Sequence, residues 1–130
     1  MRWIFYCFLV ISLLLPLAAG SAEVASGLIA VSVDGKTQGA NVSSKAARSA
    51  YYMIFDNKGK LLDVIGNPVK NAGGEAGPSA ANFLSNKGVT IVVAETFGNK
   101  MINSMKTKGI KFIEFKGTAG EAIKEVLKLK

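Results

Sequence analysis

The chain has 130 residues, 49% of them hydrophobic and 19% charged, with a formal net charge of +7 at pH 7, which allows a single domain. It has no histidine and one cysteine, Cys7, which excludes histidine-based catalysis and an internal disulfide. The basic residues are spread from Lys36 to Lys130 rather than gathered in a stripe with interleaved aromatic residues, which argues against a nucleic-acid-binding surface.

The first 22 residues predict a secretory signal peptide. Arg2 precedes an apolar stretch from Trp3 to Ala19, and small residues follow it up to Ala22. This pattern is typical of signal peptides, so we expect cleavage near Ala22 and a periplasmic or secreted protein. The alternative is membrane anchoring by an uncleaved N-terminal helix, because the apolar stretch approaches spanning length. Residues 23–27 are then a linker, and residues 28–130 form the folded domain.

The first half of this domain predicts three strands in a meander. The apolar residues 27–33 form the first strand, and Tyr51–Phe55 and Lys60–Ile65 form a hairpin around a turn at Asp56–Gly59. Lys60 and Asp63 suggest that the third strand lies at an edge of the sheet. Residues 35–50 are polar and predict a long loop with a helical turn over 45–49, and loops of this length are often functional or mobile.

The second half alternates helices and strands. Pro78 predicts the first turn of a helix that ends at Gly88, and the apolar residues 89–94 predict a strand that is buried on both faces at the centre of the sheet. A helix over 99–107 and a strand over 110–115 follow. Thr118 and Glu121 form a capping box for the last helix.

This β-β-β-α-β-α-β-α order predicts an α/β fold, a mixed five-stranded sheet with helices packed on its faces. The right-handed crossover rule makes the second strand antiparallel to the other four. The loops at 34–50, 67–78 and 95–99 then meet at one edge of the sheet, where open α/β sheets bind ligands. Two of these loops lead into helix N-termini, whose unpaired N–H groups attract anions.

The glycine-bearing loop before the first helix is the main candidate site. Its Gly73-Gly74-x-x-Gly77-Pro78 sequence lacks the ending of a nucleotide P-loop and the spacing of a dinucleotide fingerprint. We predict a backbone cradle for an anion, with positive charge from Lys45, Arg48 or Lys70. The alternative is a tight turn that needs glycines at positive φ. The predicted ligand-binding residues are Asp34, Lys45, Arg48, Asn67, Gly73, Gly74, Gly77, Phe97 and Gly98.

Two other sets of residues suggest metal sites. Asp34, Glu75 and Glu95 end or follow strands at the same predicted edge and suggest a two-metal hydrolase, but turn formation by Asp34 and solvated charge at the other two are the favoured interpretation. Met53, Met101 and Met105 could bind a soft metal, but their spacing favours core packing. Because no nucleophile and base pair is visible, we predict that the protein is not an enzyme and has no metal-ligating residues.

Several short motifs, in order, resemble one known family. They are Asn67-Pro68, Gly73-Gly74-x-Ala76-Gly77-Pro78, Gly88-Val89, Phe97-Gly98, Gly109-Ile110 and Thr118…Glu121-Ala122. Together they resemble the dinitrogenase iron–molybdenum cofactor biosynthesis family, the NifX-like proteins and the C-terminal domain of NifB, over Leu28 to Leu127. The resemblance implies a ribonuclease H-like fold and the binding of iron–sulfur or iron–molybdenum cofactor precursors.

The chain departs from the family pattern between the first two strands. Nitrogenase-associated members often carry Ser-x-His-Phe-Gly-Arg-Ala there, whereas Ser43–Ser49 of this chain retains the arginine, Arg48, but not the His, Phe or Gly. After the leader it has no His or Cys, the ligands that iron–sulfur clusters require. We therefore expect a non-catalytic binding protein for a small anionic ligand or metallo-cofactor species. The alternatives are a protein-protein interaction module without a ligand and a metal-dependent hydrolase. The expected partner is such a ligand or another protein, not nucleic acid, and a membrane only through the leader.

Overall fold

The computed structural model describes residues 27–129. The predicted signal peptide and most of the linker lie outside these residues. The elements are β1 (Leu28–Val33), the 3-10 turn η2 (Ala46–Arg48), β2 (Tyr51–Phe55), β3 (Leu61–Gly66), α1 (Ala76–Asn86), β4 (Val89–Ala94), α2 (Asn99–Thr107), β5 (Lys111–Glu114) and α3 (Ala119–Lys128). The predicted order of strands and helices is confirmed.

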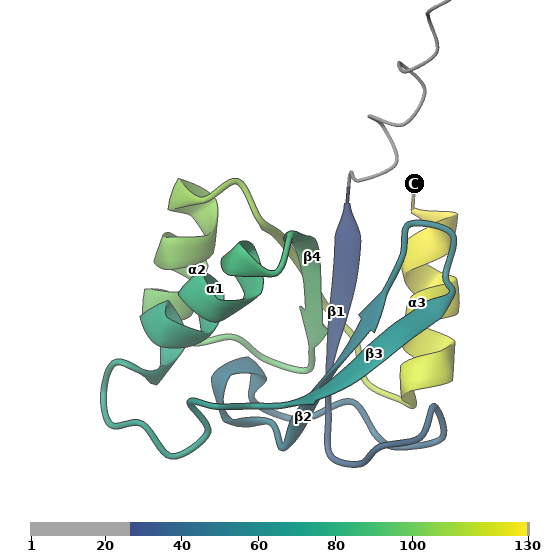
Figure 1. Cartoon of the computed structure of the whole chain (residues 1–130), viewed down its shortest axis with the longest axis horizontal. Coiled ribbons are helices and arrows are strands. Elements are labelled where there is room, and N and C mark those ends of the chain that lie inside the picture. Colours follow the sequence, from purple (N-terminus) through teal and green to yellow (C-terminus); the bar gives the residue numbers. More distant parts are fainter. Residues whose placement is uncertain (1–26, 130) are drawn as a thin grey trace, which may run out of the picture.

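The five strands form one mixed sheet in the order β3-β2-β1-β4-β5 (Figure 1). Strand β2 is antiparallel to both of its neighbours, while β1, β4 and β5 run parallel, as the crossover rule predicts. The prediction that residues 89–94 form the central strand was wrong. The β2–β3 hairpin pairs on the far side of β1, so β1 is central, and Thr90 near the start of β4 is exposed.

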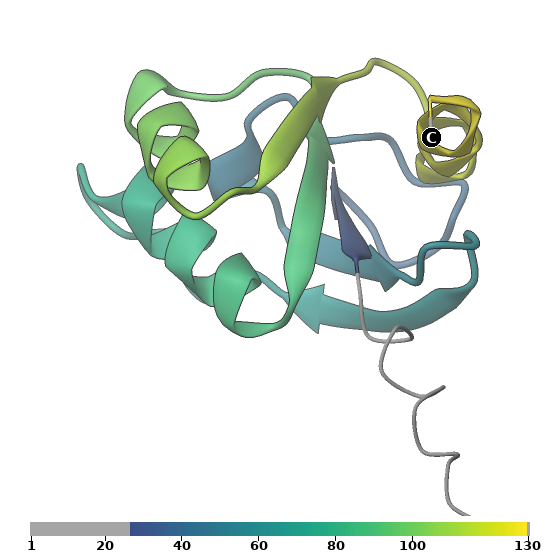
Figure 2. The ribbon, with the colours of Figure 1, turned by 90° about the horizontal axis from the view of Figure 1, so that it is seen from above.

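Two apolar clusters hold the helices on opposite faces of the sheet. Helices α1 and α2 cover one face and α3 covers the other (Figures 1 and 2). Side chains alternate along β1, so that Ala30 joins the α1–α2 cluster while Ile29 and Val31 join the α3 cluster. No helix within residues 27–129 is long and apolar enough to cross a membrane.

The parallel strands give the domain two distinct ends. We call the end where β1, β4 and β5 finish the carboxyl edge, and the end where they start the amino edge. The loops after β1, β3 and β4 lie at the carboxyl edge, at the bottom of Figure 1. The β2–β3 hairpin and the C-terminal ends of the three helices lie at the amino edge. The predicted convergence of the three loops therefore follows from the strand directions.

Candidate functional site

A cavity of about 430 Å³ opens at the carboxyl edge, between η2 and the N-terminal ends of α1 and α2. We call it the carboxyl-edge pocket. All three predicted loops contribute to its wall. Its lining residues are Lys45, Ala46, Ala47, Arg48, Gly74, Ala76, Gly77, Thr96, Phe97, Gly98, Asn99, Lys100 and Met101.

Backbone hydrogen bonds fasten η2 to the turn after β4. The N–H of Ala46 donates to the Thr96 carbonyl over 3.1 Å, and Thr96 donates to the Ser44 carbonyl through its N–H over 3.1 Å and its Oγ1 over 2.6 Å. Below them, the hydroxyl of the fully buried Tyr52 donates to the Ala46 carbonyl over 2.8 Å. Burial raises the pKa of Tyr52 to about 12, so this hydroxyl remains a neutral donor near pH 7. The η2 wall of the pocket is thus held from two sides.

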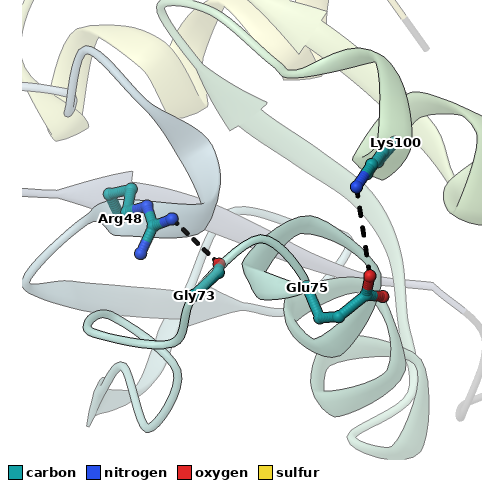
Figure 3. A network of polar contacts seen from close by, with 4 residues as sticks. All are labelled: Arg48, Gly73, Glu75 and Lys100. Atoms are coloured by element: carbon teal, nitrogen blue, oxygen red, sulfur yellow. Dashed lines mark hydrogen bonds and ion pairs between the residues drawn. The ribbon is translucent and has the colours of Figure 1, made fainter.

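Arg48 holds the loop that precedes α1. Its Nη1 donates to the carbonyls of Lys70, at 3.1 Å, and Ala72, and its Nη2 donates to the Gly73 carbonyl at 3.1 Å (Figure 3). The planar fork of a guanidinium suits several carbonyls that converge in this way. Although Arg48 lines the pocket, these hydrogen bonds make it a positioning residue for the loop.

Asn67 fastens the other end of the same loop. Its Nδ2 donates to the carbonyls of Ala47 and Ser49, each over 2.9 Å, and its Oδ1 accepts from the N–H of Val69 over 2.9 Å. Asn67 and Gly73 were both predicted as ligand-binding residues, but neither lines the pocket. Both residues instead make hydrogen bonds that shape the loop before α1, and Gly74 of this loop lines the pocket.

The glycines of the site have ordinary negative-φ or extended backbone. The described glycines at positive φ are Gly27, Gly59, Gly88, Gly109 and Gly117, so the alternative of a tight turn that needs positive φ does not hold for Gly73, Gly74 or Gly77. A Cβ atom at Gly98 would meet nothing within 4 Å, and one at Gly74 would meet only the Lys100 Nζ at 4.0 Å. These two glycines keep space open in the pocket.

Gly77 has a different role. A Cβ atom at this position would lie 2.9 Å from the backbone nitrogen of Met101 and 3.2 Å from its Cα. Such distances are too short for a real side chain, so Gly77 allows α1 and α2 to pack closely. This close packing brings the two helix N-termini to the same pocket.

The N-terminal ends of α1 and α2 have no side-chain cap. The N-cap residues, Glu75 for α1 and Gly98 for α2, make no side-chain capping hydrogen bond, and neither helix has an acidic residue in its first turn. In α3, by contrast, Thr118 and Glu121 form the predicted capping box. The first N–H groups of α2 have no partner within the helix because of helix geometry.

Lys100 is the charged pocket residue that sequence reasoning missed. It lies in the first turn of α2, where a positive side chain opposes the helix dipole. Its Nζ lies 3.9 Å from the Glu75 carboxylate (Figure 3), but both side chains are mostly exposed, at 69% and 76%, so this ion pair is weak. A lysine directly after a glycine N-cap is the sequence signal that could have identified it.

The predicted carboxylate cluster is divided. Asp34 and Glu95 line a separate hollow of about 280 Å³ with Lys116, while Glu75 faces Lys100 at the carboxyl-edge pocket. Within residues 27–129, no three His, Cys, Asp or Glu residues come together in a way that could hold a metal ion. The geometry therefore offers no two-metal centre in the described domain.

Phe97 and the three predicted methionines are buried core residues. Phe97 is buried and packs on Phe112, with ring centroids 5.1 Å apart. Met101 and Met105 are buried in the α1–α2 cluster and Met53 in the α3 cluster, as core packing requires. Of the nine predicted ligand-binding residues, the pocket brings together Lys45, Arg48, Gly74, Gly77, Phe97 and Gly98, and leaves out Asp34, Asn67 and Gly73.

Comparison with known proteins adds independent information. A sequence model described as "Dinitrogenase iron-molybdenum cofactor" matches residues 27–129. An NMR structure described as that of a NifB protein from Thermotoga is 31% identical, with a TM-score of 0.68 over 78% of this chain and 88% of that chain. No curated protein matches the chain.

Two more solved structures share the fold. The apo form of the orange protein from Desulfovibrio gigas is 21% identical, with a TM-score of 0.72 over 79% of this chain and 88% of that chain. A structure described as a dinitrogenase from Methanocaldococcus jannaschii is 12% identical, with a TM-score of 0.57 over 79% of this chain and 89% of that chain.

Proposed function

This chain belongs to the dinitrogenase iron–molybdenum cofactor family, and we propose that it is a non-catalytic protein that binds a small anionic ligand or an anionic metallo-cofactor species in the carboxyl-edge pocket. The observation that carries the proposal is the N-terminal end of α2. This end lacks a side-chain cap and an acidic residue and carries Lys100 in its first turn. A bound anion would stabilise this otherwise unfavourable arrangement of charge.

The charges around the pocket favour an anion. Each helix N-terminus contributes about half a positive charge, so the two helix ends with Lys45 and Lys100 present about +3, or about +2 after Glu75 is subtracted. N–H groups and ammonium groups are hydrogen-bond donors, which suits oxygen or sulfur atoms that carry negative charge. The pocket volume of about 430 Å³ suits a small ligand.

The same residues do not fit direct ligation of an iron–sulfur cluster. The sequence has no histidine, and its only cysteine, Cys7, precedes the described domain. Clusters are held in proteins by thiolate or imidazole ligands. A metallo-species in this pocket would therefore be held by charge and hydrogen bonds and could be released without breaking a metal–protein bond.

A shortened chain of residues 27–130 is suitable for the binding test. The family match and both apolar clusters lie within residues 27–129, so this span contains a complete core. We would titrate it with phosphate, sulfate and molybdate at low ionic strength and follow the backbone amide signals by NMR. The expected shifts are in Ala46–Arg48 and Asn99–Met101.

Matched variants separate the pocket from general charge. Lys100→Gln should weaken anion binding about tenfold, the effect of one charge-assisted hydrogen bond. Lys124→Gln removes the same charge from the exposed side of α3 and should leave affinity unchanged. The proposal is wrong if no anion shifts the pocket amides, or if both variants lose affinity equally.

Protein purified anaerobically from its own cells tests the metallo-cofactor part of the proposal. Iron or molybdenum in stoichiometric amount, lost on Gly74→Val, would support it, because a valine there fills open pocket space without touching the core. Protein free of metal and anions would contradict ligand carriage and favour the protein-protein interaction module.

We further propose that residues 1–22 are removed on export, leaving the domain in the periplasm or outside the cell. The charged start, apolar centre and small-residue exit of this segment support the proposal. The intact mass of protein from the periplasmic fraction should correspond to a chain that starts near Glu23. A full-length mass in the membrane fraction would instead show an anchor.

A further inference from the structure

The amino edge gathers segments that are far apart in the sequence. The starts of β1, β4 and β5 lie there, since Leu28 pairs with Val89 and Ile91 pairs with Lys111. The β2–β3 hairpin reaches the end of α3, where a Cβ atom at Gly59 would lie 2.7 Å from Leu127 Cδ1. Figure 1 shows this end of the domain at the top, with the C-terminal end of α3 beside the start of β1.

The exposed charges at this end are almost all positive. The lysines are Lys58 and Lys60 in the hairpin, Lys87 after α1, Lys106 and Lys108 at the end of α2, Lys111 at the start of β5 and Lys128 at the end of α3, and all seven are exposed. Among the described residues, Asp56 in the hairpin and Glu125 in the last turn of α3 are the acidic residues at this end. Seven lysines minus two carboxylates give this end a net charge of +5. We call this surface the basic end.

Helix dipoles explain only part of this charge. Lysines near helix C-termini are favourable, and three helices end here with about half a negative charge each, or about −1.5 in total. Lys58, Lys60 and Lys111 lie outside the helices and gain nothing from this effect. Most acidic residues of the domain lie elsewhere, for example Asp34, Glu95 and Glu114 at the carboxyl edge.

An apolar hollow opens within the basic end. Its volume is about 700 Å³, and Ile110, Phe112 and Leu129 line it together with Lys106 and Lys111. Leu129 is 63% exposed, which is unusual for a large apolar side chain. Apolar groups surrounded by lysines are typical of surfaces that lie in the headgroup region of a bilayer.

The chain also enters the domain at this end. Residues 1–26 precede Gly27 and β1, and they contain the apolar stretch Trp3–Ala19. Ala19 and Gly27 are eight residue steps apart, so the fully extended chain between them spans at most about 28 Å. Any molecule that retains the apolar stretch in a membrane would hold the basic end close to that membrane.

We propose that the basic end binds the anionic surface of a phospholipid bilayer and leaves the carboxyl-edge pocket facing away from it. The lysines contact lipid headgroups, and Leu129 and the apolar hollow contact the headgroup–acyl boundary. Strand and helix directions place the pocket at the opposite end of the domain. A ligand therefore reaches the pocket while the domain is on the membrane.

Co-sedimentation with lipid vesicles tests this proposal on residues 27–130, without the apolar stretch. Vesicles that contain phosphatidylglycerol should bind the protein, pure phosphatidylcholine vesicles should not, and salt should weaken the binding. Each lysine near an anionic surface changes binding about fivefold. The triple variant Lys106→Gln, Lys108→Gln, Lys111→Gln should therefore bind about 100-fold more weakly.

A matched triple variant controls for net charge. Lys36→Gln, Lys70→Gln, Lys116→Gln removes three exposed lysines from the carboxyl edge and should bind vesicles like the unchanged protein. Equal loss in the two triples would overturn the proposal, because it would show attraction to net charge alone. Binding of duplex DNA without binding of phosphatidylglycerol vesicles would also overturn it.

Three further readouts identify the surface and its lipid. Lys58→Gln with Lys60→Gln, in the hairpin, should weaken vesicle binding independently of β5. Millimolar inorganic phosphate should not compete, whereas competition would show a site for a free anion and contradict the proposal. Anion titration of the carboxyl-edge pocket should be unchanged in the Lys106, Lys108, Lys111 variant, so this inference and the proposed function can fail separately.

Discussion

Replacing Gly77 by alanine should destabilise the domain, whereas the same change at Gly120 should not. Each glycine is the second residue of its helix and follows an alanine, with Gly77 in α1 and Gly120 in α3. An alanine Cβ at Gly77 would lie 2.9 Å from the backbone nitrogen of Met101, while at Gly120 the nearest atom would be the Gln38 carbonyl oxygen at an ordinary 3.5 Å. The two variants thus share local sequence and differ in tertiary contact.

The expected magnitudes follow from two opposing effects. Alanine gains up to about 1 kcal/mol over glycine in a helix, and this gain applies to both sites. Overpacking against a backbone atom costs about 1–3 kcal/mol and applies only at Gly77. We expect Gly77→Ala to lose up to about 2 kcal/mol of unfolding free energy and Gly120→Ala to gain up to about 1 kcal/mol, so that Gly77→Ala is less stable than Gly120→Ala by about 1–3 kcal/mol.

Urea and thermal unfolding of residues 27–130 measure these differences. For a domain of this size, 1 kcal/mol corresponds to a shift in Tm of about 4–8 °C, so the two variants should differ by roughly 10 °C. Anion affinity should also fall in Gly77→Ala, because α1 and α2 must separate at the pocket. If Gly77→Ala is as stable as Gly120→Ala, the close helix approach is not a constraint and our account of this glycine is wrong.

Two further predictions concern side chains around the pocket. Burial raises the pKa of Tyr52 from 10.0 to about 12, so the neutral hydroxyl's contribution to folding stability is complete below pH 10 and is lost as the pH rises toward 12. Urea unfolding should show about 1.4 kcal/mol less stability at pH 11 than at pH 9 from this group. The Tyr52→Phe variant should not show this difference, and if it does, Tyr52 is not the source. A lysine at position 48 cannot hold the Lys70, Ala72 and Gly73 carbonyls together, because it lacks the guanidinium fork. In Arg48→Lys, proteolysis within residues 70–74 should therefore become about tenfold faster, while global stability should change by less than about 1 kcal/mol. An unchanged cleavage rate would show that Arg48 does not hold the loop.

The candidate site was predictable in outline because it depends on strand direction. Apolar runs and turn signals identified the strands, and the crossover rule then placed the loops after β1, β3 and β4 at one edge. The pocket contains residues from all three loops, as expected. The separate roles of its members were not predictable, because Arg48 and Asn67 act on carbonyl groups about twenty residues away.

Local sequence by itself determined the elements of this protein. The capping box at Thr118 and Glu121, the hairpin turn at Asp56–Gly59 and the helix stops at Gly88 and Gly109 involve groups only a few residues apart, so their chemistry can be read directly. Tertiary structure alone decided that β1 rather than β4 is central, that a Cβ atom at Gly77 but not at Gly120 would clash with another backbone, and that Lys100 lines the same pocket as Lys45 and Arg48. The physical reason is that strand pairing, close helix packing and the placing of charged side chains in one pocket depend on contacts between segments that are distant in the sequence. These contacts form only when the apolar clusters on both faces of the sheet are buried together.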